Sequence, residues 1–300
     1  MTSITITDLL TIIFVLVDDW YQEQGRKLLA GKVGSKPEFT DSEVITLLLA
    51  MDFIPFPSET QFLGFMRANY LDLFPKLLDQ SQFNRRARNL RLLVEQLRRS
   101  WLIQSGAVEQ SCFLLDTKPV PVVGVKRPNR RSDFAGSASY GYCASRSLKY
   151  FGYKLVALTT LEGIPVAYDL VPANTDEREA AEAVLDYLCR CQVIGDKGFI
   201  GDFWQSLIFD QTGNRIWTPK RNNQYHQNAQ DFDHWLNSVR ERIEGVFHEL
   251  TNTGRNLEKL LAKTIVGLAT RVIAKLTSHA LRHLLRMQFG IKVLTFEIST

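Results

Sequence analysis

The pattern of apolar residues changes near residue 105, and this change limits the folds that the chain can form. Before it, apolar side chains recur at helical spacing, as at Leu10, Ile13 and Val17. After it come short apolar runs of strand length, two of which end in an aspartate. The sequence therefore predicts an all-helical domain over residues 1–105, followed by an α/β domain over residues 106–300 that includes the C-terminal helices.

The first domain carries two further helix signals. Thr40 is followed three residues later by Glu43 and then by an apolar run, which is typical of a capping box at a helix start. From Ser81 to Trp101 the chain combines one apolar stripe with six arginines, and it predicts a basic amphipathic helix. We expect the arginines on the faces that the stripe leaves open.

The second domain predicts a mixed sheet of five strands flanked by helices, because two consecutive hairpin strands precede alternating strands and helices. Residues 126–149 are polar and rich in glycine and serine, so we expect a loop there, and Glu162-Gly163 indicates a hairpin turn. The expected strands are 111–116, with a continuation to 125, then 150–160, 164–171, 192–196 and 215–218. The expected helices are 176–189, 200–209 and 232 to about 286.

The charge is unevenly distributed. Residues 1–80 carry 6 Lys and Arg against 11 Asp and Glu, whereas the remainder carries 30 against 21. A basic remainder indicates a polyanionic partner, although an ordinary solvated surface accounts for it equally well. The apolar run Leu9–Val17 is far shorter than the roughly 20 residues of a membrane span. It also lacks the positive flank of a secretory signal, so we expect a cytoplasmic protein with no membrane contact.

Three carboxylates are candidates for chemistry. Asp116 and Asp196 each end a predicted strand, and Glu244 lies on the late helix at the edge of its apolar stripe. Sites in open α/β sheets form at the carboxyl ends of strands, and neighbouring acids repel unless a cation lies between them. A hard divalent ion such as Mg²⁺ fits that need. Taken singly, each acid also reads as a turn residue, a cap or a surface ion pair.

Basic residues accompany these acids along the chain. Lysine and arginine contacts to phosphate supply most non-specific affinity for nucleic acid, whereas any one basic segment alone also reads as a solvated surface. The candidate DNA-binding residues are Arg85, Arg86 and Arg88 in the basic helix, Lys126, Arg127, Arg130 and Arg131 in the expected loop, and Lys154, Lys197, Lys220 and Arg221.

Several segments together resemble the DDE transposases of bacterial insertion sequences, over about residues 40–285. These enzymes have a ribonuclease H-like catalytic domain. The matching segments are Ser81-Gln82-Phe83-Asn84-Arg85-Arg86, Leu115-Asp116-Thr117-Lys118-Pro119-Val120, Tyr140-Gly141-Tyr142-Cys143-Ala144-Ser145, Tyr150-Phe151-Gly152-Tyr153-Lys154-Leu155, Pro172-Ala173-Asn174, Gly195-Asp196-Lys197-Gly198-Phe199 and Arg240-Glu241-Arg242-Ile243-Glu244.

The resemblance implies that Asp116, Asp196 and Glu244 form the acid triad of the family, with Arg240 as the basic residue four positions before the glutamate. We expect these acids to hold two Mg²⁺ or Mn²⁺ ions. The implied activity is metal-dependent cleavage of double-stranded DNA at element ends, followed by attack of the freed 3′-OH on target DNA. Lys197 and Arg240 are expected to contact phosphates. A homodimer is expected because two element ends must be handled together.

Two positions depart from the pattern of many relatives. Asn237 stands where a tyrosine is common, three residues before Arg240, and Thr251 stands where a lysine is common, seven residues after Glu244. These departures leave two alternatives open: a catalytically inactive, transposase-derived DNA-binding protein, and a ribonuclease H-like nuclease that cuts DNA without joining it.

Overall fold

A computed structural model describes residues 4–29, 37–54, 56–123, 132–143, 147–221, 224 and 227–291. The chain forms two compact units. The first comprises Met1–Ser105 together with Asn252–Thr300, and the second comprises Gly106–Thr251. The change of sequence pattern near residue 105 thus coincides with a boundary between units. The C-terminal helical segment, which we expected to continue the second domain, groups with the first unit instead.

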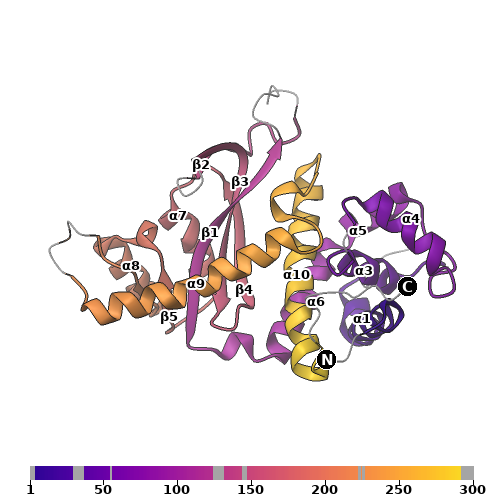
Figure 1. The fold of residues 1–300 in the computed structure, drawn as a ribbon, viewed down its shortest axis with the longest axis horizontal. Helices are drawn as coiled ribbons and strands as arrows, with labels where there is room; N and C mark the ends of the chain where they lie inside the picture. Colours follow the sequence, from indigo (N-terminus) through magenta and orange to yellow (C-terminus); the bar gives the residue numbers. More distant parts are fainter. Residues whose placement is uncertain are drawn as a thin grey trace. The chain divides into compact units, whose positions relative to one another are not determined.

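The first unit is helical, as the sequence predicts. Its N-terminal helix continues directly into a π-helical turn and then into a short helix of three residues. Its C-terminal helix is the longest of the described elements (Figure 1). The helices are α1 (Ile6–Trp20) with the π-helical turn Tyr21–Gly25 and α2 (Arg26–Leu28), α3 (Asp41–Ala50), α4 (Glu59–Asn69), α5 (Gln80–Asn89), α6 (Arg91–Gln104) and α10 (Ile265–Phe289).

The predicted capping box at the start of α3 is confirmed. The Glu43 amide donates to the Thr40 hydroxyl at 3.2 Å, and the Thr40 amide donates to the Glu43 carboxylate at 2.6 Å. Two backbone donors that the first turn leaves without helical partners are satisfied in this way, which stabilises a helix start by about 1 kcal/mol.

The predicted basic helix is two helices, α5 and α6, which meet at Leu90. Its apolar stripe is buried as expected, at Leu90, Leu93, Val94 and Leu97. The arginines do not all face outward, however. Arg98 is buried, and its guanidinium donates to the Glu95 carboxylate at 2.8 Å. Helical spacing alone does not distinguish an exposed arginine from a buried arginine that forms an ion pair with a carboxylate.

A buried ionic cluster connects three distant segments of the first unit. The Asp52 side chain is 1% exposed, and its carboxylate lies 3.2 Å from the Lys275 ammonium and 3.3 Å from the Arg255 guanidinium. The Lys275 ammonium also donates to the Thr253 carbonyl. Burial raises the pKa of Asp52, but Lys275 and Arg255 more than offset it, so that the pKa lies below its usual value. The cluster therefore holds the segment after α3, the turn before α10, and α10 itself together.

The second unit contains a six-stranded mixed sheet, in the order β2-β3-β1-β5-β6 with β4 paired to β3. Pairing is antiparallel for β1–β3, β2–β3 and β3–β4, and parallel for β1–β5 and β5–β6. The strands are β1 (Cys112–Val123), β2 (Ser139–Cys143), β3 (Leu148–Thr160), β4 (Pro165–Pro172), β5 (Gln192–Gly195) and β6 (Arg215–Trp217).

The sheet has one strand more than the five that we expected. The additional strand, β2, lies within residues 126–149, which we expected to be a loop because they are polar and rich in glycine. Tyr140 and Tyr142 point to one face of this edge strand and remain exposed, so the segment carries no apolar run that would identify it. The hairpin at Glu162-Gly163 is confirmed, and Gly163 adopts a φ of 91°, which favours glycine.

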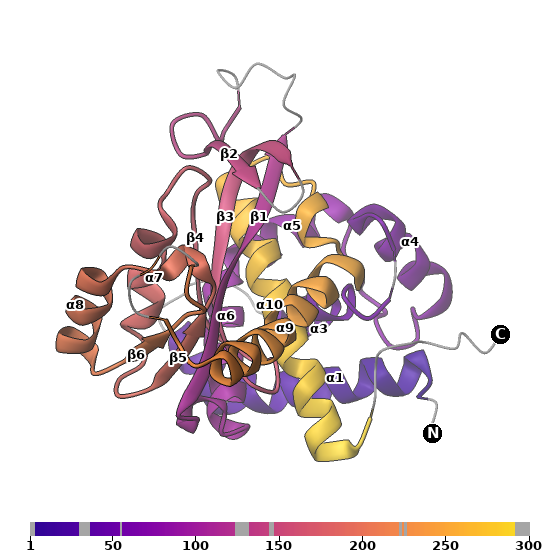
Figure 2. The same ribbon diagram turned by 60° about the vertical axis from the view of Figure 1, so that its left-hand side comes forward.

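Helices cover the sheet on both sides. They are α7 (Glu177–Leu185), α8 (Asp202–Thr212) and α9 (Gln230–Asn252). Figure 2 shows the sheet near its edge, with α7 and α8 on one side and α9 on the other. The long helix expected from residue 232 to about 286 is interrupted after α9, where Gly254 adopts a φ of 53°. None of the described helices is long and apolar enough to cross a membrane.

We predict that Asp52→Asn destabilises the protein by about 3–5 kcal/mol, because it leaves buried cations without their counterion. The exposed Asp72→Asn is the control and should change the unfolding free energy by less than about 0.5 kcal/mol. Denaturant unfolding of the full chain, followed by circular dichroism, measures both. Equal effects of the two substitutions would contradict a stabilising role of the cluster.

The same cluster predicts a pH dependence. Because the folded-state pKa of Asp52 is lowered, its contribution to stability is complete above the unfolded pKa of about 3.9 and is lost as the pH falls through the folded value. The stability difference between the wild type and Asp52→Asn should therefore be largest at neutral pH and shrink in acid. A difference that stays constant down to acid pH would contradict this prediction.

Candidate active site

Parallel pairing of β1 with β5 brings two aspartates to the same level of the sheet. The paired residues run from Cys112 opposite Gln192 to Leu115 opposite Gly195, and the next residues are Asp116 and Asp196. β1 continues to Val123 in antiparallel pairing with β3, in line with the expected continuation of this strand. Asp116 therefore lies within β1, whereas we expected it at the end of the strand. The aspartates therefore lie where β5 ends, beside a strand that continues past them.

The Asp116 carboxyl is held in an unusual electrostatic environment. Its pKa is raised to about 7, mainly by burial and in addition by the negative charges of Asp196 and Glu177. The Thr117 amide, which donates to the carboxylate at 2.7 Å, and the Arg240 charge act in the opposite direction without compensating for burial. Two nearby carboxylates with so little neutralisation favour a bound cation.

Asp196 has a local structural role as well. Its carboxylate accepts a hydrogen bond from the Gly198 amide at 2.6 Å and caps the short 3₁₀ turn Lys197–Phe199. The prediction that this residue caps a turn is thus confirmed. The cap leaves room for a functional role, because each carboxylate oxygen can accept more than one hydrogen bond.

Glu244 lies on α9, as predicted, but its side chain is 63% exposed. Arg240, one turn earlier, is largely buried, and its guanidinium lies 3.8 Å from the Glu244 carboxylate. The Arg240 Nε is buried and has no partner among the described residues. The apolar stripe of this helix is buried, among others at Leu236, Val239 and Ile243.

Glu177 is an acid of this region that the sequence analysis missed. It is the first residue of α7, and its carboxylate accepts a hydrogen bond from the Thr117 hydroxyl at 3.1 Å. Burial raises its pKa, Asp196 raises it further, and Lys154 acts in the opposite direction. An acid in the first turn of a helix is common because it complements the helix dipole, so the sequence offers no signal that distinguishes it.

Gly198 shows how close Glu177 and Asp196 lie. A Cβ atom at this position would fall 1.7 Å from Glu177 Oε2 and 2.9 Å from Asp196 Oδ1. The two oxygens can be no further apart than the sum of these distances. A side chain at this position would therefore displace the Glu177 carboxylate from its present place.

The donor set fits a divalent cation in one respect. Mg²⁺ is usually bound through one or two carboxylates together with substrate oxygens, and Asp116 and Asp196 provide two neighbouring carboxylates. The buried Nε of Arg240, which has no hydrogen-bond partner in the part of the chain that the structure describes, adds a donor suited to an anionic oxygen. The described residues contain no group of three or more His, Cys, Asp or Glu side chains arranged to hold a metal ion, so Glu244 does not complete such a group with the aspartates.

The candidate DNA-binding arginines of α5 differ in their surroundings. Arg85 is exposed. Arg86 is partly buried and bound within the first unit, since its guanidinium donates to Asp41 Oδ1 at 2.5 Å and to the Phe39 carbonyl. Arg88 is half-buried. Only Arg85 of the three therefore presents its charge freely to solvent.

The remaining basic candidates belong to the second unit. Lys154 lies on β3 and donates to the Thr175 carbonyl at 2.9 Å. Lys197 is exposed directly after Asp196, and its carbonyl accepts a hydrogen bond from the Arg221 guanidinium at 3.1 Å. Lys220 is half-buried. Four candidates lie outside the described residues, namely Lys126, Arg127, Arg130 and Arg131.

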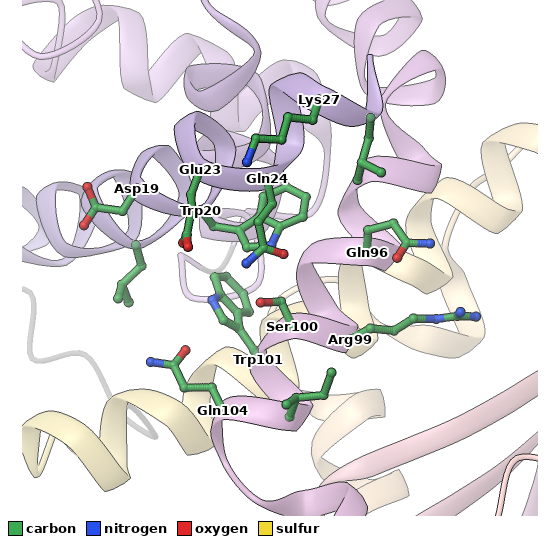
Figure 3. Close-up of a pocket in the computed structure, with 13 residues that line it drawn as sticks. Asp19, Trp20, Glu23, Gln24, Lys27, Gln96, Arg99, Ser100, Trp101 and Gln104 are labelled. Carbon is green, nitrogen blue, oxygen red and sulfur yellow. The ribbon is translucent and has the colours of Figure 1, made fainter. Parts of the chain in front are cut away.

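The first unit has a pocket of about 760 Å³ between α1, with its π-helical turn, and α6. Trp20 and Gln24 line it from one side and Trp101 and Gln104 from the other (Figure 3). None of the candidate acids or DNA-binding residues lines this pocket. The candidate active site is therefore the region around Asp116 and Asp196 in the second unit, and not this pocket.

Comparison with known proteins gives one match. Neither the curated proteins nor the solved structures contain a match to the chain. A family model described as a transposase DDE domain matches residues 108–281, which is more than half of the chain and includes both aspartates and Glu244. The mixed sheet of the second unit, with helices on both sides, is consistent with the ribonuclease H-like fold of this family. The chain therefore belongs to the DDE-domain transposase family.

Proposed function

We propose that this protein is an insertion-sequence transposase that cleaves DNA at the ends of its element and joins the freed 3′ ends to target DNA. The observation that carries the proposal is the juxtaposition of Asp116 and Asp196 directly after the last parallel pair of β1 and β5, within the segment that matches the family. Two adjacent, poorly neutralised carboxylates where β5 ends beside β1 suit the binding of divalent cations beside a phosphodiester.

Each residue of the site has a proposed task. Asp116 and Asp196 hold the cations, and Glu244 is the third acid. Bound Mg²⁺ or Mn²⁺ ions supply activation of the attacking oxygen and stabilisation of the leaving 3′ oxygen. Arg240, whose buried Nε has no described partner, and the exposed Lys197 orient the phosphates. Arg240 also keeps Asp116 closer to its ionised form, because its positive charge lowers the pKa of that carboxyl.

The remaining parts of the proposal concern the partners. Double-stranded DNA, both element ends and target, is the substrate, and the helical residues 1–105 contribute to its binding through α5. Two copies of the chain act together because two ends must be joined. A chromosomal substrate places the reaction in the bacterial cytoplasm.

Two alternatives rest on specific observations. The exposed side chain of Glu244, together with Asn237 and Thr251, favours an inactive DNA-binding protein. The Thr251 hydroxyl donates to the Phe247 carbonyl at 2.8 Å within α9 and offers no charge for a phosphate. A nuclease without strand transfer is the second alternative. Joined products in a plasmid assay distinguish the transposase from it.

We predict that Asp116→Asn and Asp196→Asn each abolish metal-dependent nicking of DNA that carries the element ends, with DNA binding largely retained. Glu244→Gln should reduce nicking strongly for the same reason, namely the loss of a carboxylate ligand. Glu241→Gln, an exposed neighbour on the same helix, is the matched control and should nick like the wild type. Gel analysis with Mg²⁺ or Mn²⁺ measures all four variants.

The outcomes separate the proposals. Nicking retained in both aspartate variants would overturn the assignment of the site. Binding without nicking in the wild-type protein would favour the inactive alternative. Nicking without joined products would favour the nuclease.

We further predict that Arg85→Gln weakens DNA binding and reduces the slope of log affinity against log salt by about one, because one phosphate contact is lost. Its thermal stability should be unchanged, since Arg85 is exposed. Arg86→Gln should instead lower the unfolding temperature, because it removes the ion pair with Asp41. Fluorescence anisotropy at several salt concentrations and thermal unfolding measure these effects. An unchanged salt slope in Arg85→Gln would rule out this contact.

A further inference from the structure

Glu177 is set apart from the other acids at the start of α7. Asp176 caps the helix, accepts from the Arg178 amide at 3.0 Å and is exposed. Glu179 is exposed as well. Glu177 is half-buried and turned toward the sheet, although a first-turn acid needs only solvent and the helix dipole to be stable. Its inward orientation therefore requires another explanation.

One side of the Glu177 carboxylate is connected to β1. Oε1 accepts the hydrogen bond from the Thr117 hydroxyl, and Thr117 directly follows Asp116. Neighbouring side chains of a strand point to opposite faces, so Thr117 faces α7 while Asp116 faces the other side. Glu177 thus holds the side chain of the residue next to the aspartate, without occupying the aspartate's own face.

The other side of the carboxylate is connected to the turn after β5. Oε2 lies over Gly198, in space that any other residue would fill with its Cβ. The amide of the same Gly198 donates to Asp196 Oδ1. One carboxylate therefore contacts both segments that carry the aspartates. Lys154 is the described cation whose charge acts on Glu177, and it donates to the Thr175 carbonyl.

We propose that Glu177 is a positioning residue of the active site: it holds the Thr117 and Gly198 segments in register, and its negative charge strengthens the binding of a divalent cation at Asp116 and Asp196. This inference rests on the proposed function. Residues that contact the metal ligands without binding the metal themselves affect metal affinity, because they orient the ligands and contribute charge. Their loss commonly reduces metal affinity 10-fold or more.

The test measures Mn²⁺ binding to the full-length protein without DNA, from the electron paramagnetic resonance signal of the free ion. Glu177→Gln keeps the shape and the acceptor for Thr117 but removes the charge. Glu177→Asp keeps the charge but shortens the reach. We expect Gln to weaken Mn²⁺ binding about tenfold and Asp to weaken it less. Glu179→Gln removes the same charge from the exposed side of the same turn and should leave affinity unchanged.

Each result decides the matter. Wild-type Mn²⁺ affinity in Glu177→Gln would overturn the proposal. Weaker Mn²⁺ binding in Glu177→Asp than in Glu177→Gln would overturn it as well, because the shape of the side chain, and not its charge, would then account for its effect. Thermal unfolding checks that the variants fold, and the Asp variant carries the test if the Gln variant does not. Parallel titration of Asp196→Asn separates the two proposals: if only that variant loses Mn²⁺, the proposed active site stands and the role of Glu177 fails.

Gly198→Ala provides a second, steric test. The added Cβ would displace the Glu177 carboxylate, so we expect weaker Mn²⁺ binding in the wild-type background. In a Glu177→Ala background the clash is removed, and the same substitution should cost less, which a double-mutant cycle detects. Gly245→Ala on α9 is the control, since no atom of the described residues lies within 4 Å of its added Cβ. Equal costs of Gly198→Ala in both backgrounds would contradict a direct contact with Glu177.

Discussion

The parallel pairing of β1 with β5 determines where the chemistry of this protein is located. Its last pair, Leu115 opposite Gly195, places Asp116 and Asp196 at one level of the sheet although 80 positions (196 − 116) separate them in the chain. A slip of one residue would turn one aspartate to the other face, because side chains alternate along a strand. The buried residues on both sides of β1, among them Phe113 and Leu114, prevent such a slip by requiring their places in the core.

The charges around the aspartates are unevenly placed, and this follows from the layers of the second unit. α7 and α9 cover opposite sides of the sheet (Figure 2), and Glu177 on α7 and Arg240 on α9 both act on the charge of Asp116. Glu177 adds negative charge, Arg240 adds positive charge, and burial keeps the pKa of Asp116 near 7. Each aspartate also accepts a local backbone hydrogen bond, Asp116 from the Thr117 amide and Asp196 from the Gly198 amide. Two neighbouring carboxylates in a buried setting repel each other and destabilise the folded chain, and a bound cation would relieve this repulsion.

Much of the fold could be predicted from the sequence. The helical first part, the capping box at Thr40, the buried strand before Asp116 and the β3–β4 hairpin all carry local signals, because periodicity and turn residues reflect interactions between near neighbours. β2 was not predicted from the sequence, because this exposed edge strand carries no apolar run. The break between α9 and α10 was not predicted because an apolar helical pattern runs on both sides of Gly254. The inward turns of Arg86 and Arg98 depend on partners that spacing does not reveal.

The sequence by itself determined the kinds of elements, their order and the two aspartates at the ends of apolar runs, since these depend on local pattern. Only the tertiary structure decided which groups meet. It placed the Thr117 hydroxyl against Glu177, 60 positions away, and Lys275 against Asp52, 223 positions away. It also turned Glu244 outward while its neighbour Arg240 became buried. The physical reason is that burial and charge pairing arise only when distant segments pack, whereas periodicity is already present in the unfolded chain.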